Sequence, residues 1–591
     1  MPAVVATSER CSAGRWPIGW LAAGVVGVAV LARCHALSNI PGLNGDEAWY
    51  GVQAWSLAQG QGALGWRTPT GNPINPLFFG PLTLLHGWLL PSITLLRSVA
   101  VVSGLLALVL NWFFCRRVFD RRTAVVSTIL LAVLPINVAY SRFAWDASQS
   151  LGATLAVVYL SLAALRFPER FVAWLLAALV AQAAAVWIHP TNVFVAPVIG
   201  LAMVLHWVSL RSEAGGVRSV VAGLWRPLPI VLLSVTIGAA VAWLGIATSG
   251  SGSLTQRLHE RLVTPAAGAS LPQPILLARF FVGGTVYRDI VGSRSWLEWP
   301  LPANQDGWGA DVALFWALMA GAMWLLWQSG RRVLGRKTVG KGLPFDGRAQ
   351  ADTVATEARL DLLLLCGWLA ALMLFAAVAG ARALLPGQER FAVCLVAPAA
   401  ILFSRSGALA WAAISVRWRP LLVAGAMGMC LLWMADFYVH YFVVIKRSGG
   451  NAHYTFRTAA VEPKVAALRF VAESGPGPKW IVCSQWWNYW PIRYLASADG
   501  RIHVLTSAEA VRSEEYRAAC GHGQAWYVEF GGTQELQELQ TRLGSHDVER
   551  QEFLDFGGRP VLCVLHPRGD FDGQDRRAGI GAAEKPAYSA R

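Results

Sequence analysis

Apolar segments long enough to cross a bilayer recur along most of the sequence. The 591 residues are 55% hydrophobic and only 14% charged, a composition typical of a polytopic membrane protein rather than of several soluble domains. A helix needs about 20 apolar residues to cross the hydrocarbon core. Segments near this length predict a mainly α-helical membrane bundle of about 11 spans, at 16–37, 97–115, 123–139, 148–165, 171–188, 191–208, 227–247, 310–328, 361–380, 391–404 and 420–444.

The first apolar segment is predicted to stay attached to the chain. It is longer than the core of a cleaved signal peptide and it follows Arg10 and Arg15, so we expect an uncleaved first span after a cytoplasmic N-terminus of residues 1–15. Residues 76–90 are shorter and are interrupted by Pro81. We therefore expect them to lie at the membrane interface or to re-enter the membrane, not to span it.

Positive charge is distributed unevenly between the loops. With about eleven spans and an internal N-terminus, the loops predicted inside hold 19 Lys and Arg in 77 residues, and those predicted outside hold 9 in 135. Cytoplasmic loops of membrane proteins are enriched in Lys and Arg. The net charge of +15 is therefore explained by topology, which argues against nucleic-acid binding and places residues 38–92 outside.

After residue 445 the hydropathy falls, and short apolar runs alternate with helical stretches. The membrane region of residues 16–445 is therefore followed by a predicted extra-cytoplasmic α/β domain at 446–566 and a disordered tail at 567–591. The predicted strands are 479–484, 501–506, 525–530 and 559–566, and the predicted helices are 507–519 and 533–543. One disulfide, with one thiol left over, stays open among Cys483, Cys520 and Cys563.

Two adjacent carboxylates, Asp46 and Glu47, follow the first span and open a segment with apolar residues at helical spacing. One interpretation is structural, with Asp46 as the N-cap of an amphipathic helix on the membrane surface. It does not explain Glu47, because a cap needs no second carboxylate. The other interpretation is catalytic, with a general base that reaches a water-soluble acceptor while the lipid phase holds the second substrate. The sequence leaves both open.

The next external loop, 140–147, carries Arg142 and Asp146. Their spacing of four residues fits an ion pair within one helical turn. Together with the neighbouring aromatic residues, such a pair is also a good interfacial anchor at the level of the headgroups. In either case Asp146 adds a second carboxylate at the depth of Asp46.

Two further polar motifs lie at the outer ends of later spans. His189 and Asn192 belong to a tight turn between the fifth and sixth spans, where the sequence favours His189 as a polar residue at a helix end over a metal ligand. Gln388, Glu389 and Arg390 precede the tenth span, and Arg390 could either snorkel to the headgroups or bind a phosphate. No sequence motif points to a metal or another cofactor, although a divalent cation on the carboxylates stays open.

Taken together, these motifs resemble those of a known family. The acidic pair follows span one, "YSRFAWDAS" follows span three, "HPTN" follows span five and "QERF" precedes span ten. Their order and common side are similar to those of the GT-C superfamily of membrane glycosyltransferases, in the branch of protein O-mannosyltransferases and lipid A aminoarabinose transferases. The resemblance covers residues 16–445.

The resemblance implies transfer of a sugar, with inversion, from a polyprenyl phosphate to an acceptor on the outer face of the membrane. It assigns the catalytic carboxylate to Asp46, with Glu47 as its neighbour, and a second acidic residue to Asp146. The remaining assignments are donor-phosphate contacts at Arg390, Arg142 and Arg67 and a substrate pocket at His189, Asn192, Gln388 and Glu389.

Two positions depart from the family pattern. Phe391 follows Arg390 where Tyr is common in the family, and residues 60–92 contain no Lys where related enzymes place a phosphate-binding Lys. Arg67 is the basic residue left in that segment. The expected phosphate contacts therefore differ in detail from those of the family.

The predicted partners are a polyprenyl-phosphate-linked sugar and an envelope acceptor, which could be lipid A, a protein or a glycan. The composition favours a bacterial inner (plasma) membrane. A transporter or flippase of lipid-linked saccharides is an alternative, but such proteins carry ionisable residues near the bilayer midplane, whereas Asp361 and Asp436 lie toward the ends of their spans. A catalytically silent envelope scaffold is a third. Polar chemistry concentrated at one interface favours the enzyme.

Overall fold

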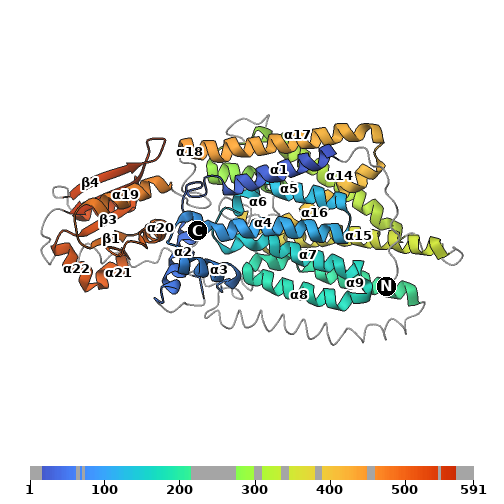
Figure 1. The fold of residues 1–591 in the computed structure, drawn as a ribbon, viewed down its shortest axis with the longest axis horizontal. Coiled ribbons are helices and arrows are strands. Elements are labelled where there is room, and N and C mark those ends of the chain that lie inside the picture. The colour runs from blue at the N-terminus through green and yellow to red at the C-terminus, as the bar shows by residue number, and fades with distance from the viewer. Residues whose placement is uncertain are drawn as a thin grey trace.

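The protein is a long helical bundle with a five-stranded sheet at one end (Figure 1). The computed structural model describes residues 16–61, 67–68, 73–214, 274–298, 309–334, 345–379, 389–448, 460–543 and 548–567. Two short helices, α2 (Gly45–Ala58) and α3 (Pro76–Trp88), lie where the bundle meets the sheet region. This junction is where the predicted acidic residue Asp46 lies.

Eight helical segments of the described residues are long and apolar enough to cross a membrane, as expected for a multi-pass membrane protein. They are Ile93–Val118, Asp146–Arg166, Pro168–Ile188, Pro190–Leu210, Ala310–Gly330, Thr353–Val378, Phe391–Ala413 and Val416–Arg447. Each overlaps a span predicted from the sequence. The predicted span 227–247 lies outside the described residues.

Long α-helices form the body of these segments, and several begin or end in a short 3-10 or π turn. The α-helices are α4 (Ile93–Val118), α7 (Ser150–Arg166), α8 (Phe171–Ile188), α9 (Pro197–Ala214), α14 (Ala310–Leu334), α15 (Phe345–Ala379), α16 (Val396–Ala413), α17 (Arg419–Phe437) and α18 (Val444–Ser448). The short turns that matter for the site are η1 (Asp146–Gln149), η3 (Pro190–Val195), η7 (Glu389–Leu395) and η9 (Tyr438–Val443). Between α9 and α14 in the sequence lie α13 (Pro274–Val282), η4 (Val286–Val291) and η5 (Trp296–Glu298), and the first two bury side chains in the main core.

The first predicted span, 16–37, is a single helix, α1 (Trp16–Cys34). Two other predicted segments take a different form. The predicted span 123–139 is divided into α5 (Arg121–Val133) and α6 (Pro135–Tyr140), because Pro135 disfavours the helical conformation at the residue before it, and Leu134 is non-helical with ψ 119°. Helix α3 has 13 residues with a proline inside, which agrees with the prediction that this segment is too short to span.

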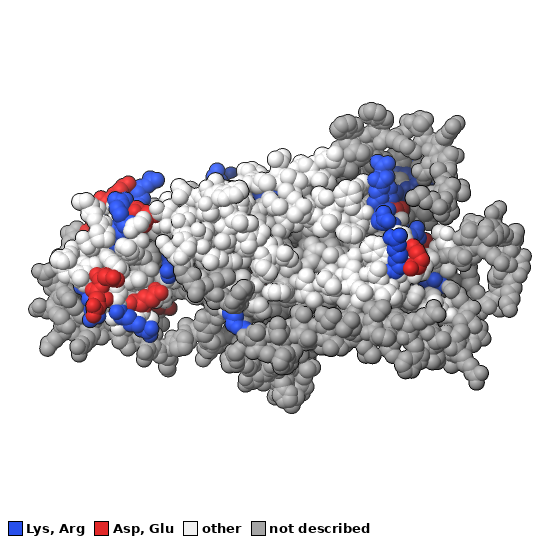
Figure 2. All heavy atoms as spheres, turned by 60° about the horizontal axis from the view of Figure 1, so that its bottom comes forward, with Lys and Arg blue, Asp and Glu red and all other residues white. Residues whose placement is uncertain are grey.

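Charged side chains gather toward the two ends of the molecule, and the surface between them shows few charges in the view of Figure 2. At the end away from the sheet, Arg405 pairs with Asp361 at 2.6 Å and with Glu357 at 2.7 Å. Arg166 pairs with the same Glu357 at 2.6 Å. These ion pairs connect α7, α15 and α16 at that end of the bundle, and we interpret their role as structural.

The C-terminal sheet has the strand order β2-β1-β3-β5-β4. β1 is parallel to β2 and β3, whereas β5 is antiparallel to β3 and β4. The strands are β1 (Lys479–Cys483), β2 (Ile502–Thr506), β3 (Ala525–Phe530), β4 (Val548–Leu554) and β5 (Pro560–Pro567). Four were predicted from the sequence, and β4 was missed because "VERQEFL" is a polar edge strand without the alternation of a half-buried one.

Helices cover this sheet and connect it to the bundle. They are α19 (Val461–Glu473), α20 (Trp486–Ala496), α21 (Ser507–Arg512), α22 (Glu514–Gly521) and α23 (Gln534–Leu543). The last three correspond to the predicted helical stretches, whereas α19 and α20 were missed. The disulfide left open by the sequence does not form in the structure, where Cys483, Cys520 and Cys563 are free thiols.

Candidate active site at the junction of bundle and sheet

Helix α2 begins with a capping box made by Asn44 and Glu47. The Asn44 side chain accepts from the Asp46 N–H at 2.7 Å, and the Glu47 side chain accepts from the Asn44 N–H at 3.2 Å. The interpretation of Asp46 as the N-cap is therefore wrong. Because Asn44 caps the helix, the Asp46 carboxylate is left to interact with other parts of the protein.

Glu47 is completely buried and holds three separate segments together. The Arg97 guanidinium of α4 donates to both of its oxygens, at 3.1 Å from Nε and 2.9 Å from Nη2. The backbone N–H of Ala144 donates to the same carboxylate at 2.7 Å. The catalytic role predicted for Glu47 is therefore corrected to a structural one, since a carboxylate with no exposed surface and four donors cannot reach an acceptor.

The next turn of α2 carries Tyr50, whose hydroxyl is under the electrostatic influence of two carboxylates. Tyr50 is buried and forms a side-chain hydrogen bond with Asp146, and it lies within electrostatic range of Asp46 as well. Burial first, then the charges of Asp146 and Asp46, raise the pKa of Tyr50 well above its ordinary value. The Ala144 N–H donates to Glu47 at 2.7 Å, so the segments that carry Asp46 and Asp146, which the sequence placed at the same depth, lie against one another.

Both carboxylates are half-buried, and each has a defined partner. The Trp486 indole N–H of α20 donates to Asp46 Oδ1 at 3.2 Å, and the Ala147 N–H donates to Asp146 Oδ1 at 2.8 Å. Asp46 comes from the helix after span one and Asp146 starts η1 at the head of α7. This arrangement offers two solvent-accessible acids at one end of a membrane bundle.

The predicted pairing of Arg142 with Asp146 is wrong. The Arg142 guanidinium is completely buried, and it donates to the carbonyls of Ala32, Arg33, Ala36 and Ile40 instead, at 2.6–3.5 Å. Its cation also lies 4.7 Å from the centroid of the Phe442 ring. The donor-phosphate role expected for Arg142 is therefore corrected, because this side chain fixes the chain between α1 and α2.

The other predicted basic residues are only partly described. Arg67 is half-buried and forms a short antiparallel bridge with Pro73. Glu389 and Arg390 begin the short helix η7, but their side chains, like the whole of Gln388, lie outside the described residues. Their predicted roles at the donor phosphate and in the substrate pocket stay predictions.

The "HPTN" and "QERF" motifs are neighbours in space. Turn η3 packs against η7, and the ring centroids of His189 and Phe391 lie 6.1 Å apart. Asn192 is buried and donates to Ser150 Oγ at 3.2 Å, which ties η3 to the head of α7 directly after η1. Asn192 is thus a packing residue, and the pocket role predicted for it is corrected, while the motifs themselves converge around one end of α7.

Helix α19 also docks on this junction. The Lys464 ammonium has no exposed surface and donates to the Leu43 carbonyl at 2.9 Å, one residue before the Asn44 cap. Burial lowers the pKa of Lys464 to about 7, against a smaller opposing effect of Glu47. The sheet region is therefore attached to the acidic helix at two places, through α19 and through α20.

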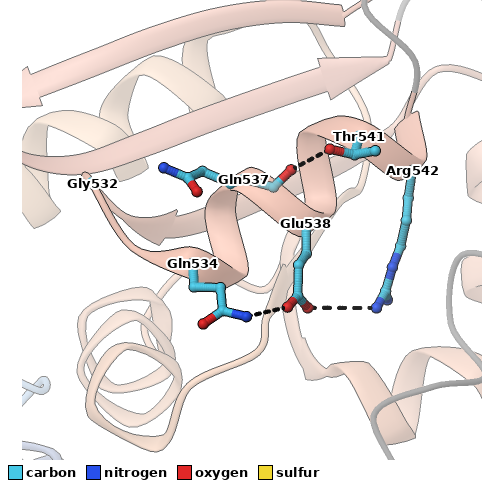
Figure 3. Close-up of a pocket in the computed structure, with 6 residues that line it drawn as sticks. All are labelled: Gly532, Gln534, Gln537, Glu538, Thr541 and Arg542. Carbon is cyan, nitrogen blue, oxygen red and sulfur yellow. Dashed lines mark hydrogen bonds and ion pairs between the residues drawn. The ribbon is translucent and has the colours of Figure 1, made fainter.

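A surface hollow of about 770 Å³ lies along α23 on the far side of the sheet region, lined by Gly532, Gln534, Gln537, Glu538, Thr541 and Arg542 (Figure 3). Gln534 donates to Glu538 at 2.8 Å, and Arg542 pairs with Glu538 at 3.7 Å. Gln534 and Arg542 both interact with Glu538 on the same helix. No residue of the Asp46 junction is among those that line the hollow. Within the described residues, no three His, Cys, Asp or Glu side chains are grouped to hold a metal ion.

Sequence reasoning missed three residues of this junction: Tyr50, Arg97 and Trp486. A signal for Trp486 was present, since Trp486, Trp490 and Tyr494 are spaced four apart, as on one face of a helix. Arg97 sits at the start of a predicted span, where its pairing with a residue 50 positions earlier leaves no local pattern.

Comparison with known proteins supports the predicted resemblance over part of the chain. Residues 83–231 match the profile of the family described as dolichyl-phosphate-mannose-protein mannosyltransferase. This stretch contains Asp146 and the turn from His189 to Asn192, and it does not contain Asp46 or Arg390. A comparison with curated proteins gave no match to the chain.

Two solved structures have a weak likeness to the whole chain. ArnT from Cupriavidus metallidurans, bound to undecaprenyl phosphate, has a TM-score of 0.49 at 14% identity, over 96% of this chain and 100% of that one. The oligosaccharyltransferase from Archaeoglobus fulgidus has a TM-score of 0.44 at 14% identity, over 87% of this chain and 70% of that one. The family profile at residues 83–231, which contains two of the four motifs, confirms that this multi-pass membrane chain resembles the GT-C membrane glycosyltransferases.

Proposed function

We propose that this protein is an integral-membrane glycosyltransferase that moves a sugar from a polyprenyl-phosphate donor to an acceptor at the outer face of the membrane. The observation that carries the proposal is the hydrogen bond from the Ala144 N–H to the Glu47 carboxylate at 2.7 Å, which holds the segments of the half-buried Asp46 and Asp146 against one another. The match of residues 83–231 to a family that uses a polyprenyl-phosphate sugar supports the donor class. Asp146 and the turn after α8 both belong to that matched stretch.

In the proposed reaction Asp46 acts as general base. It takes the proton of an acceptor hydroxyl or amine while the acceptor oxygen or nitrogen forms a bond to the anomeric carbon. The bond between that carbon and the phosphate oxygen breaks, and polyprenyl phosphate leaves with the electron pair. A single displacement of this kind inverts the anomeric centre. Asp146, held by Tyr50 and the Ala147 N–H, is proposed to orient the acceptor.

The departing phosphate needs a cation near the opposite side of the sugar. We infer that Arg390 supplies it, with Arg67 as a second basic residue. Support comes from the backbone: η7, which carries Arg390, packs against η3, and η3 is tied through Ser150 to the head of α7 beside Asp146. His189, whose ring lies beside that of Phe391, is proposed to line the substrate pocket between Asp46 and Arg390.

The orientation follows from the charge distribution along the sequence. The basic loops at 116–122 and 405–419 lie at the end of the bundle with the Arg405 ion pairs, and we infer that this end is cytoplasmic. Asp46 and the sheet region of residues 446–566 then face the periplasm or the exterior. The acceptor is an envelope molecule, with lipid A, a protein and a glycan as the candidates.

The test is a comparison of cells with and without the gene. Mass spectrometry of extracted envelope lipids, glycans and glycopeptides is expected to show one fraction that loses a pentose- or hexose-sized mass in the deletion strain. That mass names the sugar, and the fraction names the acceptor. If no fraction changes mass while a lipid-linked saccharide accumulates on the inner leaflet, the protein is a flippase and the proposal is wrong.

A further inference from the structure

One face of helix α20 runs along helix α2. The Trp490 ring meets the Trp49 ring edge-on, with 6.5 Å between centroids, and the Tyr494 hydroxyl donates to the Ser92 carbonyl at 3.0 Å. A Cβ at Gly51 would lie only 2.5 Å from the Tyr494 ring. The two helices therefore approach as closely as the glycine backbone allows, and the distance between them is fixed.

Trp486 is the member of this face that reaches the acidic site. Its Nε1–H donates to Asp46 Oδ1 at 3.2 Å, and its ring lies 3.0 Å from the place where a Cβ on Gly45 would sit. Glycine at position 45 therefore makes room for the indole directly beside the carboxylate. The contact joins two segments that are 440 residues apart in the sequence.

The sheet holds the start of α20 in a defined place. The backbone N–H and the hydroxyl of Ser484 donate to the Glu529 carboxylate at 2.7 and 2.8 Å. The Asn488 side chain donates to the Val528 carbonyl at 2.5 Å on the same strand. Ser484 and Asn488 flank Trp486, so the backbone that carries the indole is anchored to β3 on both sides.

We propose that Trp486 is a positioning residue, whose indole N–H fixes the rotamer of the Asp46 carboxylate so that the other oxygen is directed at the acceptor. The inference rests on the proposed function of Asp46 as general base. It gives the C-terminal sheet region a direct part in the reaction, since this region supplies a hydrogen-bond donor to Asp46.

The hydrogen bond also stabilises the charged form of Asp46, so its loss raises the affinity of that carboxylate for a proton. The groups that face Asp46 are Tyr50 on its own helix, Asp146 from η1 and Trp486 from α20. The other charges near the start of α2 are the Glu47–Arg97 pair and the buried ammonium of Lys464, which donates to the Leu43 carbonyl. A variant at Trp486 leaves all of these charges in place.

The test measures protonation of Asp46 on the full chain in lipid nanodiscs, without any sugar substrate. Dicyclohexylcarbodiimide modifies protonated carboxyl groups, and peptide mass spectrometry quantifies the adduct on Asp46 at each pH, with Asp46→Asn to verify the assignment. Trp486→Phe keeps the ring and removes the donor, and we expect the labelling midpoint to rise by about one pH unit.

Trp490→Phe is the matched control, because the Trp490 indole nitrogen has no hydrogen-bond partner in the part of the chain that the structure describes. Its midpoint is expected to equal that of the unmodified protein. If Trp486→Phe does not fold, Trp486→Met serves as a second donor-free variant. An unchanged midpoint in the folded donor-free variant, or an equal rise in Trp490→Phe, overturns the inference. Either result leaves the role of Asp46 in transfer to be judged from Asp46→Asn and the envelope mass change.

Discussion

Glu47 and Arg97 form an ion pair in which neither side chain has any exposed surface, with 2.9 Å between Nη2 and Oε2. Arg97 also donates to the carbonyls of Leu37, Pro41 and Gly42. The pair therefore fastens the chain between span one and α2 onto α4, and through Ala144 it fastens the loop of Asp146 there as well. This explains why a second carboxylate follows Asp46.

Replacing Glu47 with Gln should destabilise the protein strongly. The change removes one partner of a buried pair and leaves the Arg97 charge uncompensated, which typically costs about 3–5 kcal/mol. Thermal unfolding of the purified protein in nanodiscs measures the effect. Glu169→Gln, at an exposed position of η2 (Pro168–Arg170), is the control and should unfold like the unmodified protein. If Glu47→Gln and Glu169→Gln unfold at the same temperature, the Glu47–Arg97 pair does not stabilise the fold.

Gly51→Ala should separate α20 from α2. The added Cβ would lie 2.5 Å from the ring of the buried Tyr494, so the ring or the helix that carries it must shift. We expect faster proteolytic release of the C-terminal region and a loss of sugar transfer of about tenfold or more, because Trp486 moves with α20. The control is Gly80→Ala in α3, where nothing lies within 4 Å of an added Cβ. Equal protease resistance of the two variants would mean that the contact between these helices is not tight.

The sheet region should become less stable as the pH rises from about 4.5 to about 7. Burial raises the pKa of Glu529 to about 7 from the model-peptide value of 4.5, against the opposing effect of the Ser484 donors. Between these values the folded state binds more protons than the unfolded state, so the free energy of unfolding falls with increasing pH. Hydrogen–deuterium exchange of β1 and β3, corrected for intrinsic rates, measures this slope. Glu529→Gln should flatten it, and an unchanged slope would assign the dependence to another group.

Most of the membrane spans and strands could be predicted from short stretches of the sequence. Span positions follow from the hydropathy of about 20-residue segments, and the strands β1, β2, β3 and β5 follow from short apolar runs. The division at Pro135 is a local effect of a proline that hydropathy alone does not register. The polar edge strand β4 gives no such pattern, because only β5 pairs with it.

The residues of the candidate site could be predicted from the sequence only in part. The residue types and their common side predicted that acids from two external loops would lie near one another. The structure holds the two segments together through the hydrogen bond from Ala144 to Glu47 at 2.7 Å. The sequence could not distinguish the solvent-accessible carboxylate from the buried one next to it, since the difference depends on Arg97 and Ala144, far away in the chain. The same holds for Arg142, whose partners are backbone carbonyls that carry no residue-specific signal.

The central claim is that the Asp46 carboxylate is the general base of sugar transfer. Complementation of the deletion strain with Asp46→Asn tests this claim most directly. The variant keeps the size of the side chain and loses its ability to take a proton, and its amount in the membrane is checked by immunoblot. We predict that the unmodified gene restores the sugar-sized mass in the envelope fraction and that Asp46→Asn leaves it absent. Full restoration by Asp46→Asn at equal protein level would contradict the account.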